Sequence, residues 1–208
     1  MRVSDEEVMV SASGSHLIPM SAVNAYLTDL LPYTTLLTPN IPEALHLAKL
    51  VGHDFGPLDS ITPEKLTQLA ISLSANVPWV LLKGGHGPLT RNGRKSVVDI
   101  LVNKEGKTIE FVSDFSDSKN THGTGCTLAC IPLVSQSFDG AASIAANLSL
   151  GLEMDLAVEK AIRYVHGAIL HSFPMGSGNG PLNHHYRQRN LPFTPSLHPN
   201  LPVSLNSD

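Results

Sequence analysis

Short apolar runs alternate along the chain with longer stretches in which apolar residues recur every three or four positions. The runs lie at 8–10, 35–38 and 77–82. The stretches with helical spacing lie at 20–31, 42–50, 62–75 and 155–171. This alternation predicts a mostly parallel α/β sheet of short buried strands, with helices covering both of its faces.

Two further strands are predicted at 97–102 and 108–112, and the Lys-Glu-Gly-Lys segment at 104–107 joins them as a β-hairpin. The helix at 155–171 should bury one side in the core. The residues predicted to lie there are Leu156, Val158, Ala161, Ile162, Val165 and Ile169. Because Pro, Asn, His and Ser dominate after residue 174, the pattern predicts one domain over 1–190 and a disordered tail over 191–208.

Polar residues follow the predicted strands at three places. They are the segments at 38–40, 83–85 and 119–129. In open α/β sheets ligands bind beyond the carboxyl ends of the strands, so these segments should meet at one edge. The third contains Gly123, Thr124 and Gly125 just before an apolar helix. Glycines and a helix start together direct several N–H groups one way and form an anion hole, although an ordinary loop-to-helix turn explains the same residues.

Composition narrows the choice of partner and compartment. The chain has 208 residues, 42% of them hydrophobic and 15% charged, which is typical of a globular protein. Its net charge of −4 gives no reason to expect nucleic acid or an anionic membrane as a partner. The two cysteines, Cys126 and Cys130, lie too close together to form a disulfide framework. No apolar run reaches membrane-spanning length and no signal-peptide profile opens the chain, so we expect a reducing, cytoplasmic location.

Four segments together resemble the hydroxymethylpyrimidine/phosphomethylpyrimidine kinases of thiamine biosynthesis, which have the ribokinase-like fold. They lie at 8–14, 38–43, 82–86 and 119–128, and their order and spacing match over about residues 8–172. The segment at 178–184 resembles the fungal members. The resemblance implies ATP-dependent phosphorylation of hydroxymethylpyrimidine and its monophosphate, both small molecules, with Mg²⁺ as the metal.

The resemblance also implies roles in the loop at 119–129. Gly123, Thr124, Gly125 and Cys126 would hold the charge that develops on the transferred phosphoryl group. Cys126, where sugar kinases of the fold carry an aspartate, would receive the proton of the substrate hydroxyl. A helix N-terminus lowers the pKa of a thiol and makes its thiolate accessible. Without this context, Cys126 would be read as a small buried helix residue.

Other residues receive roles by the same resemblance. Asn40 and Glu43 form an N-x-x-E element that would organise Mg²⁺ through water beside the ATP phosphates, as suits a hard cation. Lys83 would face those phosphates, Thr121 would contact phosphate or brace its loop, and Val8 would border the pyrimidine. Structural interpretations stand beside these roles: Glu43 can complement a helix dipole, Lys83 can be a solvated lysine before a turn, and Val8 can be a buried strand residue.

The chain also departs from the family pattern. We expect the first part of the fold to be missing, with its glycine-rich turn, its pyrimidine contacts and its lid. Glu6 and Glu7 stand where the family has Asp-Pro. Pro132 would break the helix that follows the anion hole, because proline removes a hydrogen-bond donor and clashes with the preceding turn. The hypothesis is that 130–141 is a foreign insert, such as a translated intron, and a spliced transcript that encodes it would refute this.

Two alternative functions stay open. The first is a catalytically inactive nucleotide-binding fragment of the same family, or a partner of an intact kinase, which the expected truncation favours. The second is a pyridoxal-type kinase, which is less favoured because those kinases resemble the aspartate version of the loop. Members of the family tend to associate, so a homo-oligomer is a further expectation.

Overall fold

The computed structural model describes residues 25–58, 62–85, 89–91, 93–116, 118, 124, 144–174, 178 and 180–186. Several predictions therefore fall outside the described residues. They are the strand at 8–10, nearly all of the loop at 119–129, the proposed insert at 130–141 and the tail at 191–208.

The described elements follow the predicted alternation of strands and helices. The helical elements are the π-helical turn η1 (Tyr26–Leu30), the 3₁₀ turn η2 (Leu31–Tyr33), α2 (Ile41–Leu50), α3 (Pro63–Ser74), α5 (Ile144–Ser149) and α6 (Met154–Leu170). The strands are β1 (Leu36–Leu37), β2 (Trp79–Leu82), β3 (Leu89–Arg91), β4 (Arg94–Asn103) and β5 (Thr108–Asp114). No helix among the described residues is long and apolar enough to cross a membrane.

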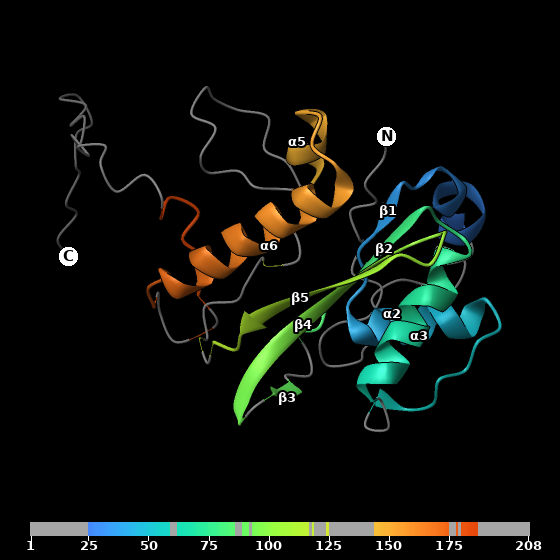
Figure 1. Cartoon of the computed structure of the whole chain (residues 1–208), viewed down its shortest axis with the longest axis horizontal. Coiled ribbons are helices and arrows are strands. Elements are labelled where there is room, and N and C mark those ends of the chain that lie inside the picture. The colour runs from blue at the N-terminus through green and yellow to red at the C-terminus, as the bar shows by residue number, and fades with distance from the viewer. Residues whose placement is uncertain are drawn as a thin grey trace, which may run out of the picture.

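The five strands form one mixed sheet (Figure 1). β1 and β2 pair in parallel, with Leu36 opposite Trp79, as expected of strands joined through helices. β4 runs antiparallel to β2, β3 and β5. The α/β class is confirmed. The expectation of a mostly parallel sheet is corrected for the described strands, where parallel pairing is limited to β1 and β2 and an isolated bridge beyond them.

The predicted hairpin is confirmed and is longer than the sequence indicated. β4 and β5 pair from Ser96 opposite Asp114 to Val102 opposite Thr108. The turn between them holds Gly106 at a φ of 86°, a conformation that favours glycine. The extra length of β4 has a physical reason, because its first residues gain β3 as a partner.

Helices cover both faces of the sheet, as predicted (Figure 1). On β2, Val80 and Leu82 pack into the core beneath α2 and α3, whereas Leu81 points to the core beneath α5 and α6. All three side chains are almost completely buried. Burial on both faces explains why the sequence of this strand is a continuous apolar run with no polar alternation.

The buried side of α6 differs from the prediction at one position. Val158, Ala161 and Ile162 are buried and Val165 and Ile169 are half-buried, but Leu156 is 43% exposed. The residues that α6 presents to the core also include Ala157, Tyr164 and Ala168. With this stripe against the sheet, position 156 lies toward the solvent side of the helix.

The segment at 180–186 packs on the last turns of α6. The Tyr164 hydroxyl donates to the His184 carbonyl oxygen at 2.8 Å, and the Asn183 N–H donates to the Ala168 carbonyl oxygen at 3.1 Å. The Tyr186 ring stacks on His171 with centroids 5.1 Å apart. Gly167 makes room for Tyr186, since a Cβ at 167 would overlap its ring.

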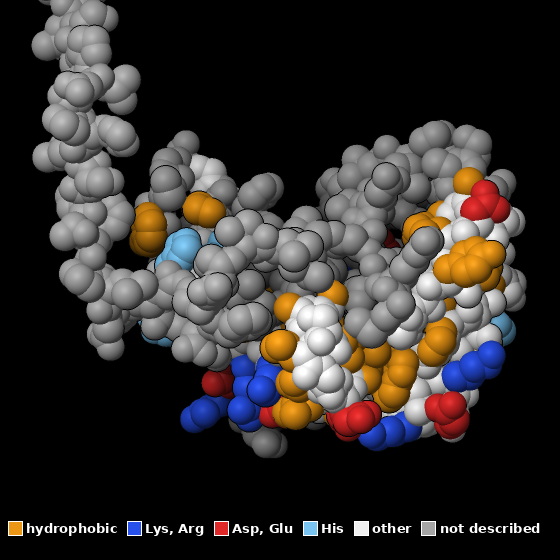
Figure 2. Space-filling model, turned by 90° about the horizontal axis from the view of Figure 1, so that it is seen from above, with side chains coloured by type: hydrophobic (Ala, Val, Ile, Leu, Met, Phe, Trp, Pro, Cys, Tyr) orange, Lys and Arg blue, Asp and Glu red, His pale blue; other side chains and the backbone are white. Residues whose placement is uncertain are grey.

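Charged side chains are mixed on the surface. Along the lower edge of the face shown in Figure 2, acidic and basic side chains of the described residues lie next to one another. One example links the hairpin turn to α6, where the Lys107 ammonium lies 3.0 Å from the Asp155 carboxylate. This face therefore presents no extended area of one sign among its described side chains.

The fit between Gly167 and Tyr186 gives a stability prediction. Ala normally favours a helix over Gly by about 1 kcal/mol. At position 167 we expect the reverse, a loss of about 1 kcal/mol in the free energy of unfolding, because the methyl group overlaps the Tyr186 ring. In a Tyr186→Ala background, Gly167→Ala should instead stabilise. Urea unfolding of the four proteins measures this, and effects of the same sign in both backgrounds would contradict the packing.

Candidate functional site

Asn40 and Glu43 build the start of α2 just beyond the end of β1. The Asn40 Oδ1 accepts the Glu43 N–H at 2.9 Å, and the Glu43 Oε2 accepts the Asn40 N–H at 2.9 Å. This reciprocal pair is a capping box, and Pro42 in the first turn adds a favourable φ. Asn40 is 8% and Glu43 3% exposed, so the pair is held in one buried geometry.

One oxygen of Glu43 stays outside the capping box. Its Oε1 is buried and has no hydrogen-bond partner among the described residues, and the same is true of the Thr38 hydroxyl at the end of β1. A buried polar oxygen without a partner is costly, by about 1–3 kcal/mol, so such a group points to a bound ligand or water. Glu43 can therefore form the capping box with Oε2 and still bind a ligand or water with Oε1.

Lys83 lies beside Asn40 at the same edge of the sheet. The Lys83 N–H donates to the Pro39 carbonyl oxygen at 2.8 Å, and Asn40 and Lys83 form an isolated parallel bridge. These contacts continue the pairing of β1 and β2 beyond the strands. Two of the three polar segments found in the sequence are thus brought together where the strands end.

Asp99 on β4 completes this edge, and the sequence reasoning missed it. Its Oδ1 accepts the Gly84 N–H at 2.8 Å, and its side chain is 9% exposed. Burial raises the pKa of Asp99 to about 6, although the Gly84 hydrogen bond and the positive charge of Lys83 act in the opposite direction. The available signal was a single carboxylate inside the apolar strand sequence Val-Val-Asp-Ile-Leu-Val.

Among the remaining predicted site residues, the structure describes Thr124, which is helical and half-buried. Val8, Thr121, Gly123, Gly125 and Cys126 lie outside the described residues. The described residues that meet at this edge are consequently Asn40, Glu43 and Lys83, with Asp99 on the neighbouring strand β4.

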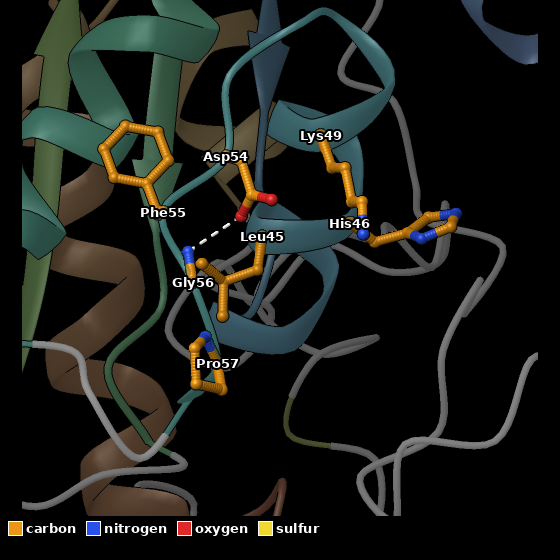
Figure 3. A pocket seen from close by; sticks show the side chains of 7 residues that line it. All are labelled: Leu45, His46, Lys49, Asp54, Phe55, Gly56 and Pro57. Carbon is orange, nitrogen blue, oxygen red and sulfur yellow. Dashed lines mark hydrogen bonds between the residues drawn. The ribbon is translucent and has the colours of Figure 1, made fainter.

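A surface pocket of about 420 Å³ lies elsewhere, along the outer side of α2 and the segment that follows it (Figure 3). It is lined by Leu45, His46, Lys49, Asp54, Phe55, Gly56 and Pro57. The Asp54 carboxylate turns back to accept the Gly56 N–H at 2.9 Å. None of the predicted site residues lines this pocket.

Known proteins place the chain in a family. A sequence model described as phosphomethylpyrimidine kinase matches residues 3–183. A hydroxymethylpyrimidine/phosphomethylpyrimidine kinase of Saccharomyces cerevisiae is 32% identical over 188 residues, and one of Streptomyces coelicolor is 34% identical over 180. These alignments cover 87% and 86% of this chain, but 31% and 57% of the relatives.

Solved structures agree on the fold. The pyridoxal kinase from Staphylococcus aureus in complex with AMP-PCP has a TM-score of 0.64 at 25% identity, covering 85% of this chain and 56% of that one. The phosphomethylpyrimidine kinase from Clostridium difficile 630 has a TM-score of 0.50 at 30% identity, covering 78% and 55%. The architecture is thus that of the ribokinase-like kinases.

The chain belongs to the phosphomethylpyrimidine kinase family, and the resemblance drawn from its motifs is confirmed. It spans about a third of the length of its fungal relatives and 57% of the Streptomyces coelicolor relative.

The buried Asp99 gives a pH prediction. Because its pKa in the folded protein lies above the ordinary 3.8, ionisation opposes folding, so stability falls as the pH rises from about 4 through 6. Asp99→Asn keeps an acceptor oxygen for Gly84 without the charge. We expect the free energy of unfolding of Asp99→Asn, relative to the unmutated protein, to rise by about 2–3 kcal/mol between pH 4 and pH 7.5.

Urea unfolding at several pH values measures this difference. Asp114→Asn removes an exposed carboxylate at the end of β5 and serves as the control for losing one surface charge. A difference between Asp99→Asn and the unmutated protein that stays constant over this pH range would contradict a carboxylate destabilised by burial.

Proposed function

We propose that the chain phosphorylates hydroxymethylpyrimidine and its monophosphate, the compounds in its relatives' names, and that ATP is the phosphoryl donor. The observation that carries the proposal is the meeting of the Asn40–Glu43 pair and Lys83 at one sheet edge, where the buried Glu43 Oε1 has no hydrogen-bond partner among the described residues. A buried carboxylate oxygen and a lysine that follow neighbouring parallel strands suit a metal–phosphate site.

ATP and Mg²⁺ are the proposed cofactors. The pyridoxal kinase from Staphylococcus aureus has been solved in complex with AMP-PCP and with ADP, which supports a nucleotide as a ligand of this fold. The described residues contain no group of three His, Cys, Asp or Glu side chains that could hold a metal ion. The Glu43 Oε1, which has no partner in the described part of the chain, nevertheless fits Mg²⁺ held through water, since this ion keeps several waters and shares phosphate oxygens. When bound, Mg²⁺ would neutralise charge on the phosphates.

The proposed division of labour follows from positioning and electrostatics, because phosphoryl transfer needs little covalent help. Lys83 and Thr121 would contact the nucleotide phosphates. The N–H groups around Gly123, Thr124 and Gly125 would hold the charge on the transferred group. The remaining roles are that Cys126 receives the proton of the substrate hydroxyl and Val8 borders the pyrimidine.

Further proposals concern the domain bounds, location, assembly and partners of the protein. We infer a kinase domain over 1–190, a tail over 191–208, a cytoplasmic location and assembly into a homo-oligomer. The small-molecule substrate is the pyrimidine, with neither nucleic acid nor membrane as a partner.

A second candidate is a nucleotide-binding polypeptide that does not turn over. It is favoured by one observation, that the chain spans a third of its fungal relatives and about 56% of the solved pyridoxal kinase. A purified chain assayed with Mg²⁺, ATP and either hydroxymethylpyrimidine, its monophosphate or pyridoxal separates the candidates. Transfer to the pyrimidines supports the first proposal, ATP binding without transfer supports the second, and transfer to pyridoxal alone refutes both.

Glu43→Gln tests the metal role. Gln keeps an oxygen that can accept the Asn40 N–H, so the capping box and the unfolding free energy should change little. The charge is lost, so we expect ATP affinity measured by calorimetry in the presence of Mg²⁺ to fall by about tenfold, and affinity without Mg²⁺ to stay nearly constant.

The matched control is Glu64→Gln, which removes an exposed carboxylate from the first turn of α3. If Glu43→Gln and Glu64→Gln change Mg²⁺-dependent affinity equally, Glu43 has only a structural role.

Cys126→Ala tests the proton acceptor. We expect kcat to fall by about 10²-fold or more while ATP affinity changes little, because the thiol would act on the reacting hydroxyl and not on the bound nucleotide. Cys130→Ala is the control at the neighbouring cysteine. Equal losses of kcat and affinity in Cys126→Ala would argue against proton transfer by Cys126.

A further inference from the structure

The turn that follows β2 is held by the strands on both sides of it. On one side, the Lys83 N–H donates to the Pro39 carbonyl oxygen at 2.8 Å. On the other, the Gly84 N–H donates to the Asp99 carboxylate at 2.8 Å. Lys83, Gly84 and Gly85 therefore leave the sheet along a path set by β1 and β4 together.

Asp99 acts where the backbone ladder stops. β2 and β4 pair regularly from Trp79 opposite Asn103 to Leu82 opposite Ile100. The next residue pair in that register would be Lys83 and Asp99, but here a side-chain oxygen accepts the N–H one residue further on. The carboxylate thus substitutes for a strand partner at the residue where the chain departs.

The fit at Gly84 is close. A Cβ at position 84 would overlap the carbonyl oxygen of Val98. Glycine is the residue that lets the turn pass directly against β4, within reach of the Asp99 side chain. The steric contact and the hydrogen bond consequently act on the same peptide unit.

The chemistry of Asp99 is unusual for a purely structural position. Asp99 is 9% exposed, and an ionised carboxylate is costly in such a buried position. A neutral acceptor could satisfy the same N–H at lower cost. A buried carboxylate kept on β4 beside the point where β2 ends is the kind of group found at functional sites.

We propose that Asp99 is a positioning residue, which fixes the Lys83–Gly84–Gly85 turn and through it presents Lys83 to the nucleotide phosphates. The second half of this statement rests on the proposed function. The first half is a property of the folded chain and can be measured without any nucleotide.

Three proteins test the proposal: the unmutated chain, Asp99→Asn and Asp99→Val. Asn retains an acceptor for the Gly84 N–H, whereas Val suits a buried strand but removes the acceptor. The first readout is amide hydrogen exchange of peptides covering 82–86, with peptides from α3 and α6 as internal references. The second is the affinity for AMP-PCP with Mg²⁺, measured by calorimetry.

In Asp99→Val we expect exchange at 83–85 to accelerate by about tenfold or more, with α3 and α6 unchanged, and AMP-PCP affinity to fall by about tenfold. Asp99→Asn should restore both readouts to near the values of the unmutated chain. If Asp99 served only to fill space in the fold, Asp99→Val and Asp99→Asn would not differ in exchange at 83–85 or in AMP-PCP affinity.

Three results would overturn the proposal. They are unchanged exchange at 83–85 in Asp99→Val, acceleration spread equally over α3 and α6, and failure of Asp99→Asn to retain protection. The last result decides the matter even if Asp99→Val does not fold. If the unmutated chain shows protected 83–85 amides but no affinity for AMP-PCP, the proposed function and the role of Lys83 in it are refuted. The exchange data then still test whether Asp99 fixes the turn.

Discussion

The candidate site depends on the hydrogen bond from the Lys83 N–H to the Pro39 carbonyl oxygen. This bond extends the parallel pairing of β1 and β2 past the last residue of each strand. It places the start of α2 next to the turn after β2, although the two segments are far apart in the sequence. Both strands are short, but burial on both faces fixes their positions. The polar residues that follow β1 and β2 are therefore held at a fixed distance from each other.

The same residues serve the fold and the site at once. In the capping box, Asn40 and one oxygen of Glu43 satisfy N–H groups that any helix start leaves unpaired. That use is complete with one carboxylate oxygen, and the other remains buried with no partner in the described part of the chain. A structural explanation of the N-x-x-E pattern is therefore correct but does not account for every buried polar atom.

The sequence predicted the features that are determined within a few residues and missed those that depend on contacts between distant segments. The strand at 77–82 and the hairpin were evident because burial and turn chemistry act over a few residues. Leu156 was assigned to the core wrongly, since periodicity gives the width of an apolar stripe less exactly than its existence. Asp99 was overlooked because its partner, Gly84, is set by strand register, and the packing of Tyr186 on α6 depends on a long-range fit that no local pattern reveals. Of the site, the meeting of two strand ends was foreseeable from topology alone.

An experimental structure of the chain with AMP-PCP and Mg²⁺ tests the central claim most directly. The account predicts that the terminal phosphates lie at the carboxyl ends of β1 and β2, in contact with Lys83 and its turn, and that the Mg²⁺ contacts the Oε1 of Glu43 through water. A nucleotide bound elsewhere, such as in the pocket beside Phe55, with the edge at Asn40 and Lys83 left empty, would contradict it.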